Sequence, residues 1–182
     1  MTSRETFVEI ATRAYGKDIA LDMYDYFDML NNRLYDGKLP YTLITFEILA
    51  YGRCIGLTNT SNGHIRIKKP PKGTPINFDG PTLGILLHEM IHYANNYVAI
   101  NHDVHVSASM QSSHMNPYWI GEINRIHKII TGDDLNAGPE KMKRVGKKVK
   151  RVMTGSLTRD QISRYPMSLD PDLVLDYLYY GT

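Results

Sequence analysis

Apolar residues recur at helical spacing over the first 35 residues of the chain and again at three later places. From residue 3 to residue 35 two apolar faces follow one another, and Gly16 separates them, so we expect two helices. Asp36 and Gly37 then end the second helix. The same periodicity predicts helices over residues 81–96 and 117–130, and a short last helix that begins at Pro171.

Between the second and third predicted helices the pattern changes to short segments that are rich in β-branched residues. These segments cover residues 43–49, 53–58 and 64–68, with Gly and Asn in the turns between them. The connections are short enough for antiparallel neighbours, so we expect a small, mainly antiparallel sheet of about three strands. The predicted fold class is therefore α+β, with N-terminal helices, the sheet, further helices and a C-terminal extension.

Length and composition limit the classes of protein that the chain can belong to. Its 182 residues allow one domain with an appendage. The single cysteine, Cys54, excludes an internal disulfide and an all-cysteine zinc ribbon, and we expect it to pack in a strand. We find neither a secretory signal nor a membrane span. We therefore expect a cytoplasmic protein, or one associated with a nucleoid or nucleus, that is not secreted and has no membrane partner.

Positive charge is concentrated in one segment of the chain. Residues 141–151 hold seven of the 21 Lys and Arg and no acidic residue, which leaves 14 basic and 19 acidic residues elsewhere. Such a segment is either a solvated surface helix or a contact with a polyanion such as DNA. The candidate nucleic-acid contacts are Lys141, Lys143, Arg144, Lys147, Lys148, Lys150 and Arg151. We place the folded domain at residues 1–138 and the extension at 139–182, and expect its apolar end to dock on the body or on a partner.

The predicted helix over residues 81–96 contains His88-Glu89-Met90-Ile91-His92 in an apolar context. Residues four apart share one helix face, so both imidazoles can reach one metal ion. Glu89 falls beside this face, where a carboxylate suits the handling of a metal-bound water better than metal ligation. Because buried imidazoles and carboxylates need partners, the pattern predicts a hydrolytic zinc site.

Spacing alone leaves the third ligand of this site open. The extended metzincin pattern needs a histidine six residues after His92, where Val98 stands, so that class is excluded. The remaining candidates for the third ligand are His102, His105, His114 and Glu122. Candidates for a second stabiliser of the oxyanion are Tyr93, His105 and Tyr118, whereas we expect Trp119 to be a packing residue.

A resemblance to a known family narrows this choice. Residues 31–40, Asn-Asn-Arg-Leu-Tyr-Asp-Gly-Lys-Leu-Pro, resemble the N-x-x-L-F-x-G-x-L-P signature of the SprT-like (Spartan-type) metallopeptidases. As in that family, short strands and then Leu-Leu-His-Glu-Met-Ile-His follow, and residues 114–118 resemble its H-G-x-x-F pattern. The resemblance covers about residues 18–130. It implies a zincin-like domain in which His88, His92 and His114 hold Zn²⁺ and Glu89 is the catalytic acid/base.

The motif and the resemblance together predict a zinc metalloendopeptidase. A metal-activated water attacks a peptide carbonyl, Glu89 transfers the proton, and an edge of the sheet aligns an extended peptide. The expected substrate is a protein or peptide, and DNA is a candidate partner through residues 141–151, so DNA-associated proteins are candidate targets.

Two other functions compete with this prediction. The first is a non-catalytic DNA-associated binding protein with a structural zinc site. Glu89 discriminates against it, because a closed structural site has no use for a free carboxylate beside its metal. The second is hydrolysis of another amide, such as a cell-wall peptide, which the missing export signal disfavours.

Overall fold

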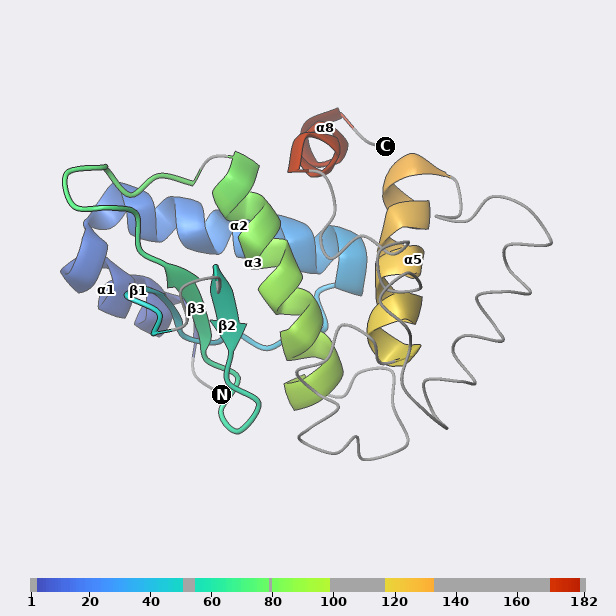
Figure 1. Cartoon of the computed structure of the whole chain (residues 1–182), viewed down its shortest axis with the longest axis horizontal. Helices are drawn as coiled ribbons and strands as arrows, with labels where there is room; N and C mark the ends of the chain where they lie inside the picture. Colours follow the sequence, from blue (N-terminus) through green and yellow to red (C-terminus); the bar gives the residue numbers. More distant parts are fainter. Residues whose placement is uncertain (1–2, 51–54, 79, 99–116, 133–170, 181–182) are drawn as a thin grey trace.

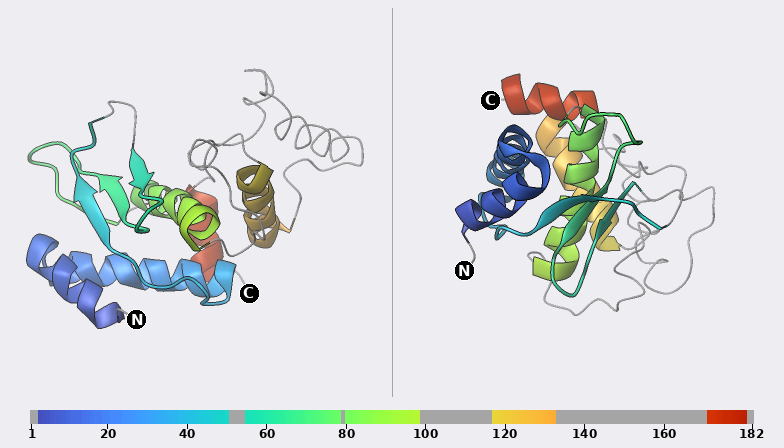
Figure 2. Two further views of the ribbon diagram at one scale, coloured as in Figure 1. Left: turned by 90° about the horizontal axis from the view of Figure 1, so that it is seen from below. Right: turned by 90° about the vertical axis from the view of Figure 1, so that its left-hand side faces the viewer.

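The computed structural model describes residues 3–50, 55–78, 80–98, 117–132 and 171–180. Within these residues the chain is a mixed α+β protein with five α-helices, a π-helix and one sheet of three strands (Figure 1). Helices α1 and α2 lie side by side, and α3 lies over α2 with the sheet on one side and α5 on the other (Figures 1 and 2). The predicted α+β class is confirmed.

The first two helices are separated where the sequence predicts a break. Helix α1 spans Arg4–Tyr15 and α2 spans Lys17–Tyr35. Gly16 between them has φ of 92°, a left-handed value that a side chain disfavours, so the chain turns there. Ser3 caps α1 by accepting a hydrogen bond from the backbone N–H of Thr6.

The loop after α2 is fixed by the asparagine near the end of that helix. Asp36 has φ of 54° and takes the left-handed conformation that ends α2. The buried Asn31 side chain then donates to the carbonyl of Leu39 at 2.9 Å and accepts from its N–H at 3.0 Å. This pair of bonds anchors the turn between α2 and the sheet.

The sheet has a different pairing from the one that the sequence predicts. Its strands are β1 (Ile44–Glu47), β2 (Gly56–Thr58) and β3 (Ile65–Lys68), in the order β1-β3-β2. Strand β2 pairs antiparallel with β3, but β1 pairs parallel with β3, so the expectation of a mainly antiparallel sheet is wrong. The β1–β2 connection carries the chain from one edge to the other. The strand with the buried Ile65 and Ile67 thereby takes the centre, where both of its edges are paired.

Helix α3 spans Gly80–His92 and continues without a break into a π-helix, η1, at Tyr93–Val98. Helix α3 contacts β2, β3, α2 and α5, so it is the central element of the core. Helix α5 spans Pro117–Thr131, close to its predicted range. No local pattern of residues predicts the change from α to π geometry after His92.

The last helix, α8 (Pro171–Tyr180), belongs to the same core. It packs on α3, α5 and α2, where Val174 and Leu178 are fully buried. The expectation that the C-terminal end docks on the body is confirmed for these residues. Helix α8 lies beside the first turns of α3 and the last turns of α5, away from the end of α3 that carries the histidines (Figures 1 and 2).

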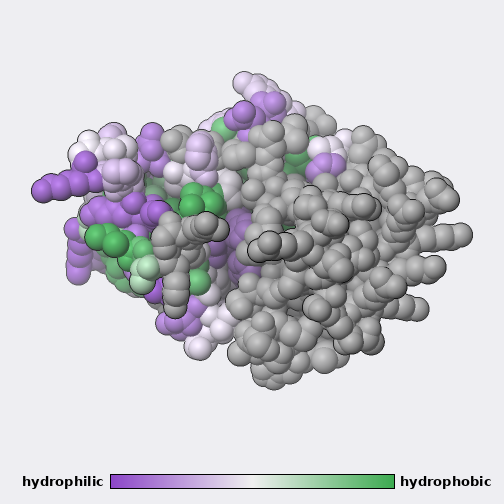
Figure 3. Space-filling model, viewed as in Figure 1, coloured by the Kyte–Doolittle hydropathy of each residue, from purple (hydrophilic) through white to green (hydrophobic). Residues whose placement is uncertain are grey.

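The described residues on the face shown in Figure 3 mix hydrophilic and apolar side chains. Ile48 and Ile55, which border β1 and β2, are the most exposed large aliphatic residues. No helix in the described ranges is long and apolar enough to cross a membrane. The basic segment 141–151 and its candidate contacts lie outside the described residues, as does Cys54.

Candidate metal centre

The two histidines of the HExxH motif lie side by side on α3, as their spacing predicts. The ring centroids of His88 and His92 are 5.1 Å apart, and the ring planes are inclined by 67°. Both side chains are half-buried. Nδ2 of Asn96, one turn later in η1, lies 3.4 Å from Nδ1 of His92. This contact helps to orient the His92 ring.

Trp119 of α5 contacts both imidazoles from the facing helix. Its ring centroid lies 4.6 Å from that of His88 and 4.3 Å from that of His92, and it stacks on His92 with an angle of 28°. The indole is buried, as expected for a packing residue. Because its neighbours are the two motif histidines, it also fixes the position of α5 relative to them.

Glu89, beside the histidine face of α3, is buried against the edge strand β2. Its side chain is 3% exposed, and the Thr58 hydroxyl donates to Oε2 at 2.8 Å and to the Glu89 carbonyl at 2.9 Å. Burial raises the pKa of the Glu89 carboxyl to about 7, although the contacts with Thr58 oppose this shift. The carboxyl can therefore both accept and release a proton near neutral pH.

Strand β2 approaches Glu89 so closely that any side chain at position 56 would force the strand or the carboxyl to shift. A Cβ atom on Gly56 would lie 2.5 Å from Oε1 and 2.8 Å from Cγ of Glu89. Sequence reasoning missed both Gly56 and Thr58 as neighbours of the motif. The available signal was the glycine itself, because glycine inside a strand pattern often marks a close approach of another group.

Glu122, one of the open candidates for the third ligand, is engaged elsewhere. It is buried, and its two carboxylate oxygens accept hydrogen bonds from Arg125 at 2.6 Å and 3.0 Å. Arg125 also donates to the carbonyl of Leu34 and lies over the Tyr35 ring, so this ion pair joins α5 to α2. Tyr93, a candidate oxyanion stabiliser, donates its hydroxyl to the Pro40 carbonyl.

The described residues supply only part of a metal site. No three His, Cys, Asp or Glu side chains among them lie close enough to share an ion. The other candidate ligands His102, His105 and His114 lie outside these residues, as does the side chain of Tyr118. Two imidazoles on one face fit Zn²⁺, since zinc prefers nitrogen and sulfur donors and needs a further protein ligand.

Comparisons of the chain with family models, with curated proteins and with solved structures find no match.

Proposed function

We propose that the chain is a zinc-dependent metallopeptidase with a zincin-like fold of the SprT-like type. The observation that carries the proposal is the pair of adjacent imidazoles of His88 and His92, with the buried carboxyl group of Glu89 next to them on the same helix. In this proposal His88, His92 and His114 hold the zinc ion and Glu89 is the catalytic residue. The assignment of His114 rests on the resemblance of residues 114–118 to the family pattern.

The chemistry divides between the ion and the chain. A bound zinc ion would supply a Lewis acid that activates water and polarises the peptide carbonyl. Glu89 accepts the proton of the attacking water and then donates it to the leaving amine. Thr58 donates to Oε2 of Glu89 and so positions the carboxyl group. Trp119 and Asn96 orient the imidazole rings from two sides.

A protein or peptide suits this site as a substrate. Strand β2 is an edge of the sheet and carries the residues that touch Glu89, so an extended peptide paired with it would pass beside the carboxyl. Backbone pairing makes such binding tolerant of sequence. Contact of residues 141–151 with DNA would direct this activity toward DNA-associated proteins.

The decisive experiment measures zinc content and peptide hydrolysis on the same protein samples. Glu89→Gln should keep stoichiometric zinc and lose hydrolysis of an unfolded protein by about a hundredfold or more, because the proton carrier is gone. Glu9→Gln, at an exposed position of α1, is the matched control and should leave both quantities unchanged. Full activity in Glu89→Gln would contradict the proposed mechanism.

The ligand set is tested by separate alanine changes at His88, His92, His102, His105 and His114. Zinc should be lost in the His88, His92 and His114 variants and kept in the other two. A His114→Ala protein that retains its zinc would contradict the family assignment. Stoichiometric zinc in a wild type without any hydrolysis would instead support the structural zinc site of a binding protein.

A further inference from the structure

A cavity of about 580 Å³ lies between the N-terminal helix, the loop after α2, the β2–β3 turn and η1. It is built by residues other than His88, Glu89 and His92. Four of the twelve residues that line it are aromatic, namely Phe7, Tyr41, Tyr93 and Tyr97. A volume of this size and a wall of this kind are typical of sites for small aromatic groups.

The wall of the cavity is held in place before any ligand arrives. Gly63, in the β2–β3 turn, has φ of 73°, and a Cβ on it would lie 2.5 Å from the Tyr93 ring and 2.8 Å from the Tyr97 ring. The two tyrosine rings stack on each other at 5.5 Å with an angle of 16°. The Thr42 hydroxyl donates to the Gly63 carbonyl at 2.8 Å, which ties the turn to the loop before β1. A ligand therefore has little conformational freedom of these wall residues to restrict when it binds.

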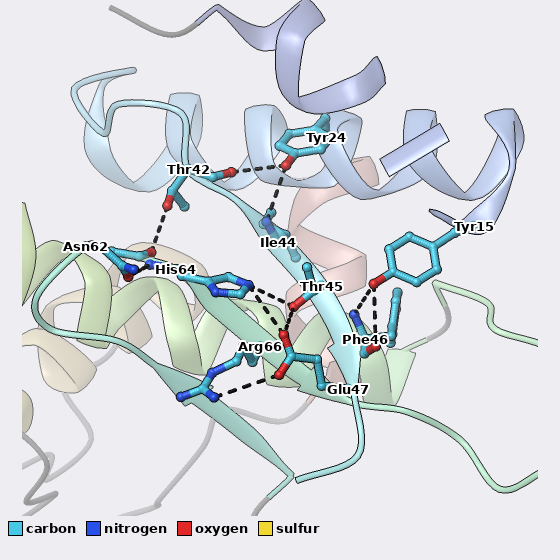
Figure 4. Close-up of polar contacts among 11 residues, drawn as sticks. Tyr15, Tyr24, Thr42, Ile44, Thr45, Phe46, Glu47, Asn62, His64 and Arg66 are labelled. Carbon is cyan, nitrogen blue, oxygen red and sulfur yellow. Dashed lines mark hydrogen bonds and ion pairs between the residues drawn. The ribbon is translucent and has the colours of Figure 1, made fainter. Parts of the chain in front are cut away.

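His64 is a polar residue in the wall of the cavity, and its hydrogen bonds indicate which ring nitrogen carries the hydrogen (Figure 4). The Thr45 hydroxyl donates to Oε1 of Glu47 at 2.7 Å, so its oxygen accepts from Nε2 of His64 at 2.8 Å. With its hydrogen on Nε2, the neutral ring has Nδ1 as a hydrogen-bond acceptor. Nδ1 has no partner among the described residues and is left for a ligand.

Burial favours the neutral form of the His64 ring. Burial lowers the pKa of His64, and the nearby Arg66 guanidinium lowers it further, while Glu47 acts in the opposite direction. Arg66 in turn lies 3.8 Å from Oε2 of Glu47, so the carboxylate already has a cationic neighbour. A neutral His64 accepts a hydrogen bond at Nδ1, whereas a protonated ring would only donate.

We propose that this cavity binds a planar aromatic group that carries a hydrogen-bond donor, such as a phenol. The ring lies against Tyr97 and Tyr93, and its hydroxyl donates to Nδ1 of His64. The group arrives either as a free phenolic compound or as a tyrosine side chain of a polypeptide. The site is separate from the proposed zinc centre, and neither depends on the other.

The chemistry is tested with three small probes on the full chain, with binding followed by saturation-transfer NMR. The probes are p-cresol, toluene, which lacks the donor, and 4-methylcyclohexanol, which lacks the aromatic ring. We expect p-cresol to bind about fivefold more tightly than either of the others, because one hydrogen bond or one ring contact is missing in each. Equal binding of all three probes, or no saturable binding of p-cresol up to its solubility, would overturn the proposal.

Variants locate the binding in this cavity. Tyr97→Ala removes a half-exposed ring and should weaken p-cresol about fivefold, whereas Tyr180→Ala, at an exposed position of α8, should have no effect. His64→Phe keeps the shape of the ring and should erase the preference for p-cresol over toluene. Unchanged p-cresol binding in Tyr97→Ala would place the ligand elsewhere and refute the assignment.

Two peptides distinguish a free phenol from a tyrosine side chain as the natural ligand. One is an unfolded peptide with a single tyrosine, and the other is the same peptide with alanine in its place. Tighter binding of the tyrosine peptide than of p-cresol assigns the site to polypeptides. Equal affinities assign it to free phenols. Equal binding of the tyrosine and alanine peptides, in competition with p-cresol, would show that the cavity does not select the ring and would overturn the proposal.

Discussion

The carboxyl group of Glu89 is partly protonated at neutral pH. It is almost fully buried, and burial raises its pKa from 4.5 to about 7. Between these two values the folded chain without metal binds a proton that the unfolded chain has released. The same burial that suits Glu89 to proton transfer therefore costs stability at neutral pH.

The stability of the metal-free protein should accordingly fall as the pH rises from about 4.5 to about 7. The folded-state pKa lies above the unfolded value, so this contribution is complete below about 4.5 and is lost as the pH rises through about 7. The rise of the Glu89 pKa corresponds to a loss of about 3 kcal/mol in the free energy of unfolding. Urea unfolding in the presence of a chelator measures it.

The Glu89→Gln variant is the reference for this measurement, since its amide does not titrate. Subtracting its profile removes the contributions of all other groups. A wild-type profile that runs parallel to that of the variant would show that Glu89 has an ordinary pKa.

The residues of the motif were predictable because their relation is local. His88 and His92 are one helical turn apart, so their shared face follows from helix geometry. Thr58 and Gly56 contact Glu89 from a strand some 30 residues earlier in the chain, and no local pattern gives that contact. Sequence reasoning therefore found the candidate acid/base and missed the groups that contact its carboxyl.

At the scale of elements, local signals also decided what could be predicted. The ends of the helices follow from Gly16, Asp36, Pro117 and Pro171, whose backbone preferences act within a few residues. The order of the strands depends on contacts between residues far apart in the chain, and those contacts are a property of the whole core. The parallel pairing of β1 with β3 was therefore not predictable from the short connections.

The close approach of β2 to α3 should be sensitive to a single methyl group. Gly56→Ala would bring Cβ to 2.5 Å from Oε1 of Glu89, so either the strand or the carboxyl must shift. We expect hydrolysis to fall about tenfold or more, because proton transfer depends on position, while zinc content stays unchanged. Zinc analysis and turnover of an unfolded protein substrate measure the two effects.

Gly121→Ala is the control for this change. Gly121 lies on the exposed side of α5 with no atom near the position of an added Cβ, so the same substitution should be tolerated and slightly stabilising there. Equal activity of the Gly56→Ala and wild-type proteins would mean that the strand is free to move away from Glu89.

At the scale of the whole molecule, the last helix holds the fold together at the end opposite the histidines. Val174 and Leu178 enter the core that α2, α3 and α5 form. The Tyr179 hydroxyl lies 2.9 Å from that of Tyr26, and Arg33 donates to the Tyr177 carbonyl at 2.8 Å. Helix α8 thus stabilises the ends of α3 and α5 that face away from the proposed zinc site.

Truncation of one core side chain in α8 should lower the stability of the entire fold. Leu178→Ala should reduce the free energy of unfolding by about 2–4 kcal/mol, because a fully buried leucine leaves a cavity. Tyr180→Ala, two residues later and 82% exposed, should change it by less than about 0.5 kcal/mol. Chemical denaturation measures both, and similar values for the two variants would show that α8 is not part of the cooperative unit.

The strand order also has a consequence for how the protein is made. The central strand β3 is the last of the three to leave the ribosome, and β1 has no partner before it arrives. A nascent chain that ends before residue 65 therefore leaves the backbone edge of β1 unpaired, and holding such intermediates apart is a task for chaperones. The β2–β3 hairpin closes locally, so its arrival completes the sheet in a single step.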